Sequence, residues 1–158
     1  MIKNVILILM SIVTFSFSGI VNSETGWDYQ QSTFQAFYML ESMQIDGIEV
    51  ESGDVIGAFK EDLCLGWVYA DPTGYTTIPV MGDDGSEYSE GYLASGEVPD
   101  IYIYDSTYSS ILSVIPSENL LGWANNEIFI VNGISVANNT FGCTDSNSCN
   151  YDPDATAD

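Results

Sequence analysis

The chain has 158 residues, with 23 acidic side chains, two basic side chains and no histidine, so its formal net charge is −21. Binding to nucleic acids or to anionic membranes needs clustered Lys and Arg side chains, so this composition argues against both. The lack of histidine excludes Ser-His-Asp and Cys-His catalysis and zinc sites built on histidine. Cations, neutral glycans and basic proteins remain as partner classes, although an acidic surface also simply keeps a secreted protein soluble.

Residues 1–23 have the pattern of a secretory signal peptide. Lys3 supplies a positive charge before the apolar run Val5–Ile20. Small residues then offer a cleavage site at Ser18-Gly19 or after Val21-Asn22-Ser23. A membrane anchor is the alternative, which the short length of the run and its serine and threonine content disfavour. We therefore expect a secreted or cell-surface protein without membrane insertion after the signal is removed.

Residues 24–137 are expected to form one all-β domain, an antiparallel β-sandwich of the jelly-roll or immunoglobulin-like type. Short apolar runs separated by Gly, Pro, Asp and Asn turns are typical of the strands of such folds. No stretch has a convincing helical period, and the aromatic residues of 34–43 favour strand. The expected strands span residues 34–45, 48–50, 55–59, 63–69, 75–81, 98–105, 108–115 and 127–136.

The element around which this domain is organised is expected to be a hairpin. Its two strands, Val55–Phe59 and Leu63–Tyr69, are nearly continuous in apolar residues and are joined by Lys60-Glu61-Asp62. Strands that are apolar on both faces are usually covered on both sides, so the hairpin should lie centrally in a sheet. The side chains predicted for the core are those of Phe59, Leu63, Leu65, Ile101 and Ile103.

Aromatic side chains are the candidate ligand-binding groups, because aromatic rings can stack on sugar rings. The candidates are Tyr102, Tyr104, Tyr108 and Trp123. The three tyrosines are expected to form a stripe on one sheet face, and Trp123 follows a turn and is the ring expected to be most exposed. The competing interpretation is that such rings belong to the core, which we favour for Trp67. An exposed, coplanar set would favour glycan binding, and a buried set would favour a structural role.

The polar loop Gly82–Gly91 contains four carboxylates, those of Asp83, Asp84, Glu87 and Glu90. Crowded carboxylates repel one another, which raises their pKa values unless a cation is bound or the side chains splay into solvent. We favour splaying, since an acidic loop is usually a solvated one. Convergence of Asp54 or Asp105 on the loop would favour a Ca²⁺ site instead.

Residues 138–158 are expected to be a linker followed by a short, irregular segment rich in Cys and Asp. The segment has almost no apolar residues, so ordering it would need a disulfide or a metal ion. Asp and Asn recur at near-alternate positions, and such oxygen ligands can wrap a Ca²⁺ ion. The candidate ligands are Asp145, Asn147, Asn150, Asp152, Asp154 and Asp158.

The three cysteines are Cys64, Cys143 and Cys149. An oxidising compartment permits disulfides, but an odd number leaves one thiol over. Cys143 and Cys149 are close enough in sequence to close a small loop, and a bridge from Cys64 to the tail is the alternative. Cys64 lies in an apolar strand, where we expect a buried thiol that behaves as a small hydrophobic side chain.

The tail also resembles a known repeat. Residues Gly142–Asp158 are similar to the start of a Cys-rich repeat of secreted multidomain proteins from marine and related bacteria, which runs G-C-T-D-x-x-A-C-N-Y-x-P-x-A-T-x-D-D-G-S-C. This chain has Ser148 in place of the usual Ala and stops before the final D-G-S-C. We therefore expect the sequence to be a fragment that ends within its first repeat, where Ca²⁺ binding would be weak or lost.

The region before the tail resembles the all-β domain of unknown function that often precedes such repeats. The matching stretches are residues 32–38, 53–59, 64–66, 79–85 and 103–105. This resemblance implies a secreted, surface-associated module of a larger protein.

We therefore expect a non-catalytic module for adhesion, display or spacing within a larger extracellular protein, with a carbohydrate-binding module as the alternative. Its partners would be a neutral glycan or another surface protein. A pair of carboxylates could hydrolyse a glycoside. However, among 23 acidic residues some pair always lies at a suitable separation, so the pattern does not indicate an enzyme.

Overall fold

The structure is a computed structural model in which residues 19–114 and 120–136 are described. It is almost entirely β, as predicted, and η1 (Glu87–Ser89), one turn of 3-10 helix, is the only helical element in the described ranges. Within those ranges, no helix has the length and apolar character of a membrane span. The tail, residues 138–158, with its six candidate Ca²⁺ ligands and two of the cysteines, lies outside the described residues.

The described residues form short strands that match most of the expected ones. They are β1 (Ile20–Val21), β2 (Asp28–Tyr29), β3 (Gln35–Leu40), β4 (Met43–Ile45), β5 (Ile48–Glu49), β6 (Val55–Lys60), β7 (Leu63–Tyr69), β8 (Thr76–Met81), β9 (Asp100–Asp105), β10 (Ser110–Val114), β11 (Ile128–Val131) and β12 (Ile134–Val136).

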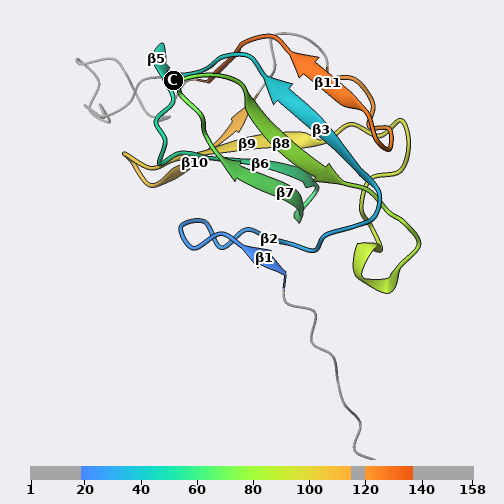
Figure 1. Cartoon of the computed structure of the whole chain (residues 1–158). Helices are drawn as coiled ribbons and strands as arrows, with labels where there is room; N and C mark the ends of the chain where they lie inside the picture. Colours follow the sequence, from blue (N-terminus) through green and yellow to red (C-terminus); the bar gives the residue numbers. More distant parts are fainter. Residues whose placement is uncertain (1–18, 115–119, 137–158) are drawn as a thin grey trace, which may run out of the picture.

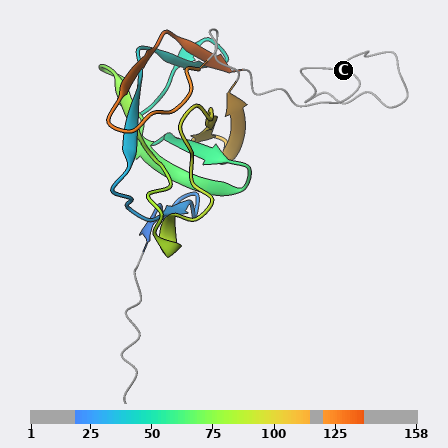
Figure 2. The same ribbon diagram turned by 90° about the vertical axis from the view of Figure 1, so that its right-hand side faces the viewer.

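Two main sheets pack together as a sandwich. The four-stranded sheet has the order β10-β9-β6-β7 and is antiparallel throughout. The three-stranded sheet, β11-β3-β8, covers one face of it, while the β1–β2 hairpin lies against the other face (Figure 1). A third, small sheet has the order β12-β4-β5. The β1–β2 hairpin and the loop that carries η1 lie at the same end of the molecule (Figure 2).

The core lies between the two main sheets and is filled by every second side chain along the strands. Ala36, Tyr38 and Leu40 of β3 are buried, and the residues between them are partly exposed. Ile101 and Ile103 of β9 are buried in the same alternating way. Successive side chains of a strand point to opposite faces, so each strand contributes every second residue to the core.

The prediction that the hairpin lies centrally in a sheet is correct for β6 and wrong for β7. β6 lies inside the four-stranded sheet, paired with β9 on one side and β7 on the other. β7 ends that ladder but packs closely beside β8, where a side chain on Gly66 would collide with the backbone carbonyl of Pro79. Leu65 is the extra residue of a β-bulge opposite Ala58 and Phe59. A bulge bends the strand that carries it, here β7.

The core prediction holds for four of its five residues. Phe59, Leu65, Ile101 and Ile103 are buried, whereas Leu63 is 39% exposed and the prediction for it is wrong. Leu63 pairs with Lys60 directly beside the turn of the hairpin. The pairing of β6 with β9 ends one residue before Lys60, at Phe59, so this end of the hairpin extends past the ladder and Leu63 is only partly covered.

Two strand pairs are parallel, which an antiparallel sandwich does not predict. β11 runs parallel to β3, and β12 runs parallel to β4. The expected long strand of residues 34–45 is divided at Glu41 and Ser42, and its partner is divided at residues 132–133. Hydrogen bonds from Glu41 N to Val131 O (3.0 Å) and from Ile134 N to Ser42 O (2.8 Å) carry the pairing across the break. The paired segments therefore pass together from one sheet to the next.

Candidate functional site

The outer face of the four-stranded sheet, turned away from β8, carries a set of aromatic side chains. In register across the sheet, Gly57 lies between Tyr102 and Trp67. One row further, Val55 lies between Tyr104 and Tyr69. Tyr102 and Tyr104 therefore share one face, as their alternation in the sequence predicts. Large rings therefore flank Gly57 and Val55 of the central strand on this face.

Trp27, from the β1–β2 hairpin, packs onto this face. A Cβ atom on Gly57 would lie 2.7 Å from the Trp27 indole and 2.7 Å from the Phe59 ring. Only glycine at this position therefore allows the indole to approach the strand so closely. The hairpin is held in place by Trp67, whose Nε1–H donates to the carbonyl oxygen of Ile20 at 2.9 Å.

Beside Trp27 lies a hollow of about 380 Å³, which we name the aromatic hollow. Its lining residues are Trp27, Phe59, Glu61, Asp62, Tyr102 and Ile111. Phe59 is only 8% exposed and forms the floor, while the half-buried Trp27 and Tyr102 form walls. The ring of Phe59 meets that of Trp27 at 78° and that of Tyr102 at 88°, with centroids 5.2 and 5.3 Å apart. The rings thus stand at right angles to one another beside an open hollow, and they are not the coplanar platform on which an extended chain would stack.

The rim of the aromatic hollow is acidic. Glu61 and Asp62 form the exposed tip of the β6–β7 turn, where Glu61 has a φ of 54°. Ionised carboxylates are acceptors only, so the rim can receive hydrogen bonds from ligand hydroxyl or ammonium groups. Since the lining contains no basic side chain, an anionic ligand would be repelled.

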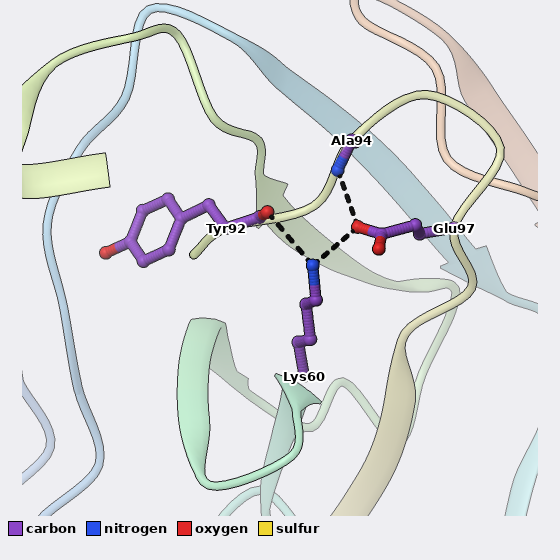
Figure 3. A network of polar contacts seen from close by, with 4 residues as sticks. All are labelled: Lys60, Tyr92, Ala94 and Glu97. Atoms are coloured by element: carbon purple, nitrogen blue, oxygen red, sulfur yellow. Dashed lines mark hydrogen bonds and ion pairs between the residues drawn. The ribbon is translucent and has the colours of Figure 1, made fainter. Parts of the chain in front are cut away.

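Lys60, the one basic residue after Lys3, is not among the residues that line this hollow. Its Nζ lies 2.7 Å from Glu97 Oε2 and 3.5 Å from the carbonyl oxygen of Tyr92, and Glu97 also accepts the Ala94 N–H at 2.8 Å (Figure 3). These hydrogen bonds, first that of Lys60 and then that of the Ala94 amide, lower the pKa of the Glu97 carboxyl. The network ties the tip of β6 to the segment after η1.

The other two aromatic candidates lie elsewhere. Trp123 is 2% exposed, and its Nε1–H donates to the carbonyl oxygen of Val80 at 3.0 Å, so the expectation of an exposed ring is wrong. The ring fills the space left by the missing side chain of Gly82. Tyr108 is 70% exposed and belongs to the turn after β9, where it lines a separate hollow. It does not extend the stripe of Tyr102 and Tyr104.

That separate hollow, of about 230 Å³, is lined by several carboxylates. Asp54 and Asp105 are 3% and 4% exposed, and both carboxylates accept hydrogen bonds from backbone N–H groups. Asp54 accepts hydrogen bonds from Ser106 N (2.9 Å), Ser106 Oγ (2.8 Å) and Glu51 N (2.8 Å), and Asp105 accepts from Thr107 N (2.8 Å). Neither converges on the loop of residues 82–91. In the described part of the chain, no three Cys, Asp or Glu side chains are grouped as metal ligands.

In the loop of residues 82–91, Asp84 accepts several hydrogen bonds. They come from Ser86 N (3.0 Å), Thr33 Oγ1 (2.7 Å), Thr33 N (3.0 Å) and Ser89 Oγ (2.8 Å). The bonds from Ser86, then Thr33 and then Ser89, lower the pKa of Asp84 well below its usual range. The expected rise through carboxylate repulsion is therefore wrong for Asp84, because its nearest neighbours are donors.

Cys64 is a free thiol that is 5% exposed, as the sequence predicts. Burial raises the pKa of this thiol to about 11, although a weak hydrogen bond to Gly66 opposes the shift. A thiol with this pKa is protonated at neutral pH, so it is neither a nucleophile nor a metal ligand there.

The aromatic hollow is therefore the site that the geometry supports, and of its six lining residues only Tyr102 is among the candidates predicted from the sequence. The sequence pattern places Phe59 in the core and does not predict that Trp27, Glu61, Asp62 and Ile111 lie beside it. The available signal was Gly57, since a glycine inside an apolar strand marks a close approach by another group. Comparison of the chain with protein-family models, with curated proteins and with solved structures finds no match in any of the three.

Proposed function

We propose that the chain is a non-catalytic, exported binding module that holds a neutral sugar residue in the aromatic hollow. The observation that carries this proposal is the corner formed by Trp27, Phe59 and Tyr102 beside the carboxylates of Glu61 and Asp62. A sugar ring has apolar C–H faces that pack on aromatic rings. It also has hydroxyl groups that donate to carboxylates, and hydrogen bonds to ionised groups are the stronger ones.

The size of the hollow and the charge of the protein restrict the class of ligand further. A volume of about 380 Å³ lies at the lower end of the range of about 300–1,000 Å³ that is usual for small-molecule sites. Rings that stand at right angles offer no flat platform for an extended chain, so we propose that the ligand is the end or a single residue of a glycan chain. The net charge of −21 and the acidic rim oppose sulfated or uronic acid glycans.

Such binding suits the module of a larger extracellular protein that the amino-acid sequence leads us to expect. A signal-like N-terminus and an acidic, soluble chain fit a protein that works outside the cell. Binding through one hollow would be weak, and repetition or display on a surface would raise the effective affinity. Adhesion to a glycan-coated surface is therefore the role that we propose.

Titration calorimetry of the full chain with a panel of neutral mono- and oligosaccharides tests this function. We expect saturable binding to at least one of them, and a loss of about tenfold or more in affinity for Tyr102→Ala. Tyr108→Ala is the matched control, because Tyr108 is exposed outside the hollow and its removal should leave the affinity unchanged. Glu61→Gln and Asp62→Asn, at exposed positions, test the rim without disturbing the core.

Aromatic rings beside carboxylates can also hold an alkylammonium group by cation–π attraction. Tetramethylammonium is therefore included in the titration. Binding of this cation without binding of any neutral sugar would overturn the glycan proposal. Equal losses for the Tyr102 and Tyr108 variants would also contradict it, because the aromatic hollow would then have no special role.

A further inference from the structure

The N-terminal hairpin decides between the two cleavage sites that the sequence offers. Ile20 pairs with Tyr29 and Val21 pairs with Asp28, so both residues are strand residues of the folded domain. The carbonyl oxygen of Ile20 also accepts the Trp67 Nε1–H at 2.9 Å. Cleavage after Ser23 would remove this entire strand, whereas cleavage at Ser18-Gly19 would keep it.

Asn22 organises the turn between the two strands. Its side chain is 1% exposed, and Oδ1 accepts hydrogen bonds from Glu24 N (3.0 Å), Thr25 N (2.9 Å) and Thr25 Oγ1 (3.1 Å). The backbone N–H of Asn22 donates to the carbonyl oxygen of Trp27 at 2.8 Å. Cleavage after Ser23 would remove the acceptor of three hydrogen bonds and the donor that fixes Trp27, which is a wall of the aromatic hollow.

Gly19 is in close contact with Asp28. The carboxylate of Asp28 occupies the place that a side chain on Gly19 would take, so a residue without a side chain fits there. Ser16 and Ser18 lie three residues and one residue before the Ser18–Gly19 bond, where signal peptidases favour small side chains.

We infer that a signal peptidase cleaves the chain between Ser18 and Gly19, and that the new α-ammonium group of Gly19 pairs with the Asp28 carboxylate. Water is the co-reactant: the C–N bond between Ser18 and Gly19 breaks, and the hydroxyl of water adds to the Ser18 carbonyl carbon. The leaving nitrogen of Gly19 takes up protons to become an ammonium, and Ser18 ends as a carboxylate. Lys60 is the one basic side chain after the cut, so this terminus adds a second positive charge to the mature chain.

The inference rests on the proposed export, and one experiment separates the two. The full precursor is produced in a bacterial host with a secretory pathway, and the exported protein is analysed by intact mass and N-terminal sequencing. We expect a chain that begins at Gly19. A chain that begins at Glu24 or at another residue would overturn the inference but leave export standing. Uncleaved protein retained in the cell would overturn both.

Matched variants test the choice of bond. Ser18→Leu places a large residue beside the Ser18–Gly19 bond and should abolish the Gly19 terminus. Ser23→Leu changes the alternative site in the same way and should leave the Gly19 terminus intact. If instead the Ser23 variant alone alters processing, the inference is wrong.

Asp28→Asn tests the ion pair in the mature protein. An opposite charge nearby raises the pKa of an amino group above its ordinary value of about 7.7–8.0. The pKa of the Gly19 α-amino group, measured from the pH dependence of its labelling rate, should therefore be higher in the native chain than in Asp28→Asn. The same pKa in both proteins would overturn the pairing.

Discussion

Trp27 packs its indole ring against the backbone of Gly57, at a place where a Cβ atom would lie 2.7 Å from the ring. This contact joins the N-terminal hairpin to the central strand of the four-stranded sheet. It also sets one wall of the aromatic hollow, because the same Cβ position is 2.7 Å from the Phe59 ring. The position of the hairpin and the shape of the aromatic hollow therefore both depend on this glycine.

Replacing Gly57 with Ala should lower both the stability of the folded chain and its affinity for the proposed ligand. The added methyl group cannot be accommodated without moving Trp27 or Phe59, and such overpacking costs about 1–3 kcal/mol of unfolding free energy. Denaturant unfolding should show that loss, and titration should show weaker ligand binding. Gly74→Ala is the control, since its nearest contact would be Asp71 Oδ2 at 3.7 Å, and a surface change of this kind stays within about 0.5 kcal/mol. Equal unfolding curves for the two variants would contradict the close contact.

Asp84 should make stability depend on acid pH. Hydrogen bonds from Ser86, Thr33 and Ser89 lower the pKa of this carboxyl in the folded chain. A lowered folded pKa contributes stability above the unfolded pKa of about 3.9, and that contribution is lost as the pH falls towards the folded value. Asp84→Asn should therefore have a lower melting temperature than the native chain at pH 7, with a gap that closes below about pH 4.

The control for this pH dependence is Glu90→Gln, an exposed carboxyl of the same loop. Its melting temperature should follow that of the native chain at every pH. A gap for Asp84→Asn that stays constant through the acid range would show that the ionised carboxylate is not the stabilising form.

Trp123 should matter for folding and not for ligand binding. Replacing it with Phe removes the N–H that satisfies the buried carbonyl oxygen of Val80. An unsatisfied buried polar group costs about 1–3 kcal/mol, and the smaller ring leaves some space unfilled as well. Calorimetric melting should reveal the lower stability, while the affinity of the native-state protein for its ligand stays the same. A selective loss of affinity would contradict the separation of Trp123 from the aromatic hollow.

Cys64 should be unreactive in the folded protein. Its burial and a pKa of about 11 leave very little accessible thiolate at pH 8, and the thiolate is the reactive form. Iodoacetamide should therefore label Cys64 only after denaturation, as measured by mass mapping of the peptide that contains it. Mapping separates this thiol from Cys143 and Cys149. Rapid labelling in native buffer would mean that the strand opens at this point.

The amino-acid sequence by itself determined the strands, their alternation and the class of fold. Period-two patterns are local, so they correctly placed Ile101 and Ile103 on one face of β9 and Tyr102 and Tyr104 on the other. The nearly continuous apolar run Leu63–Tyr69 identified Cys64 as a buried residue of an apolar strand. These properties depend on neighbours that are close in the chain, which is why they can be read from it.

Only the tertiary structure decided what covers each face. The burial of Trp123 depends on Val80 and Gly82, which are some forty residues away in the sequence. The exposure of Leu63 reflects its place at the end of the hairpin, beyond the pairing of β6 with β9. Contacts between residues so far apart in the chain cannot be predicted from a short stretch of sequence. The same apolar residue is buried where a neighbouring strand covers it and is left exposed beside a turn. The aromatic hollow has the same origin: its walls, Trp27 and Tyr102, both pack on Phe59 only because segments distant in sequence lie side by side.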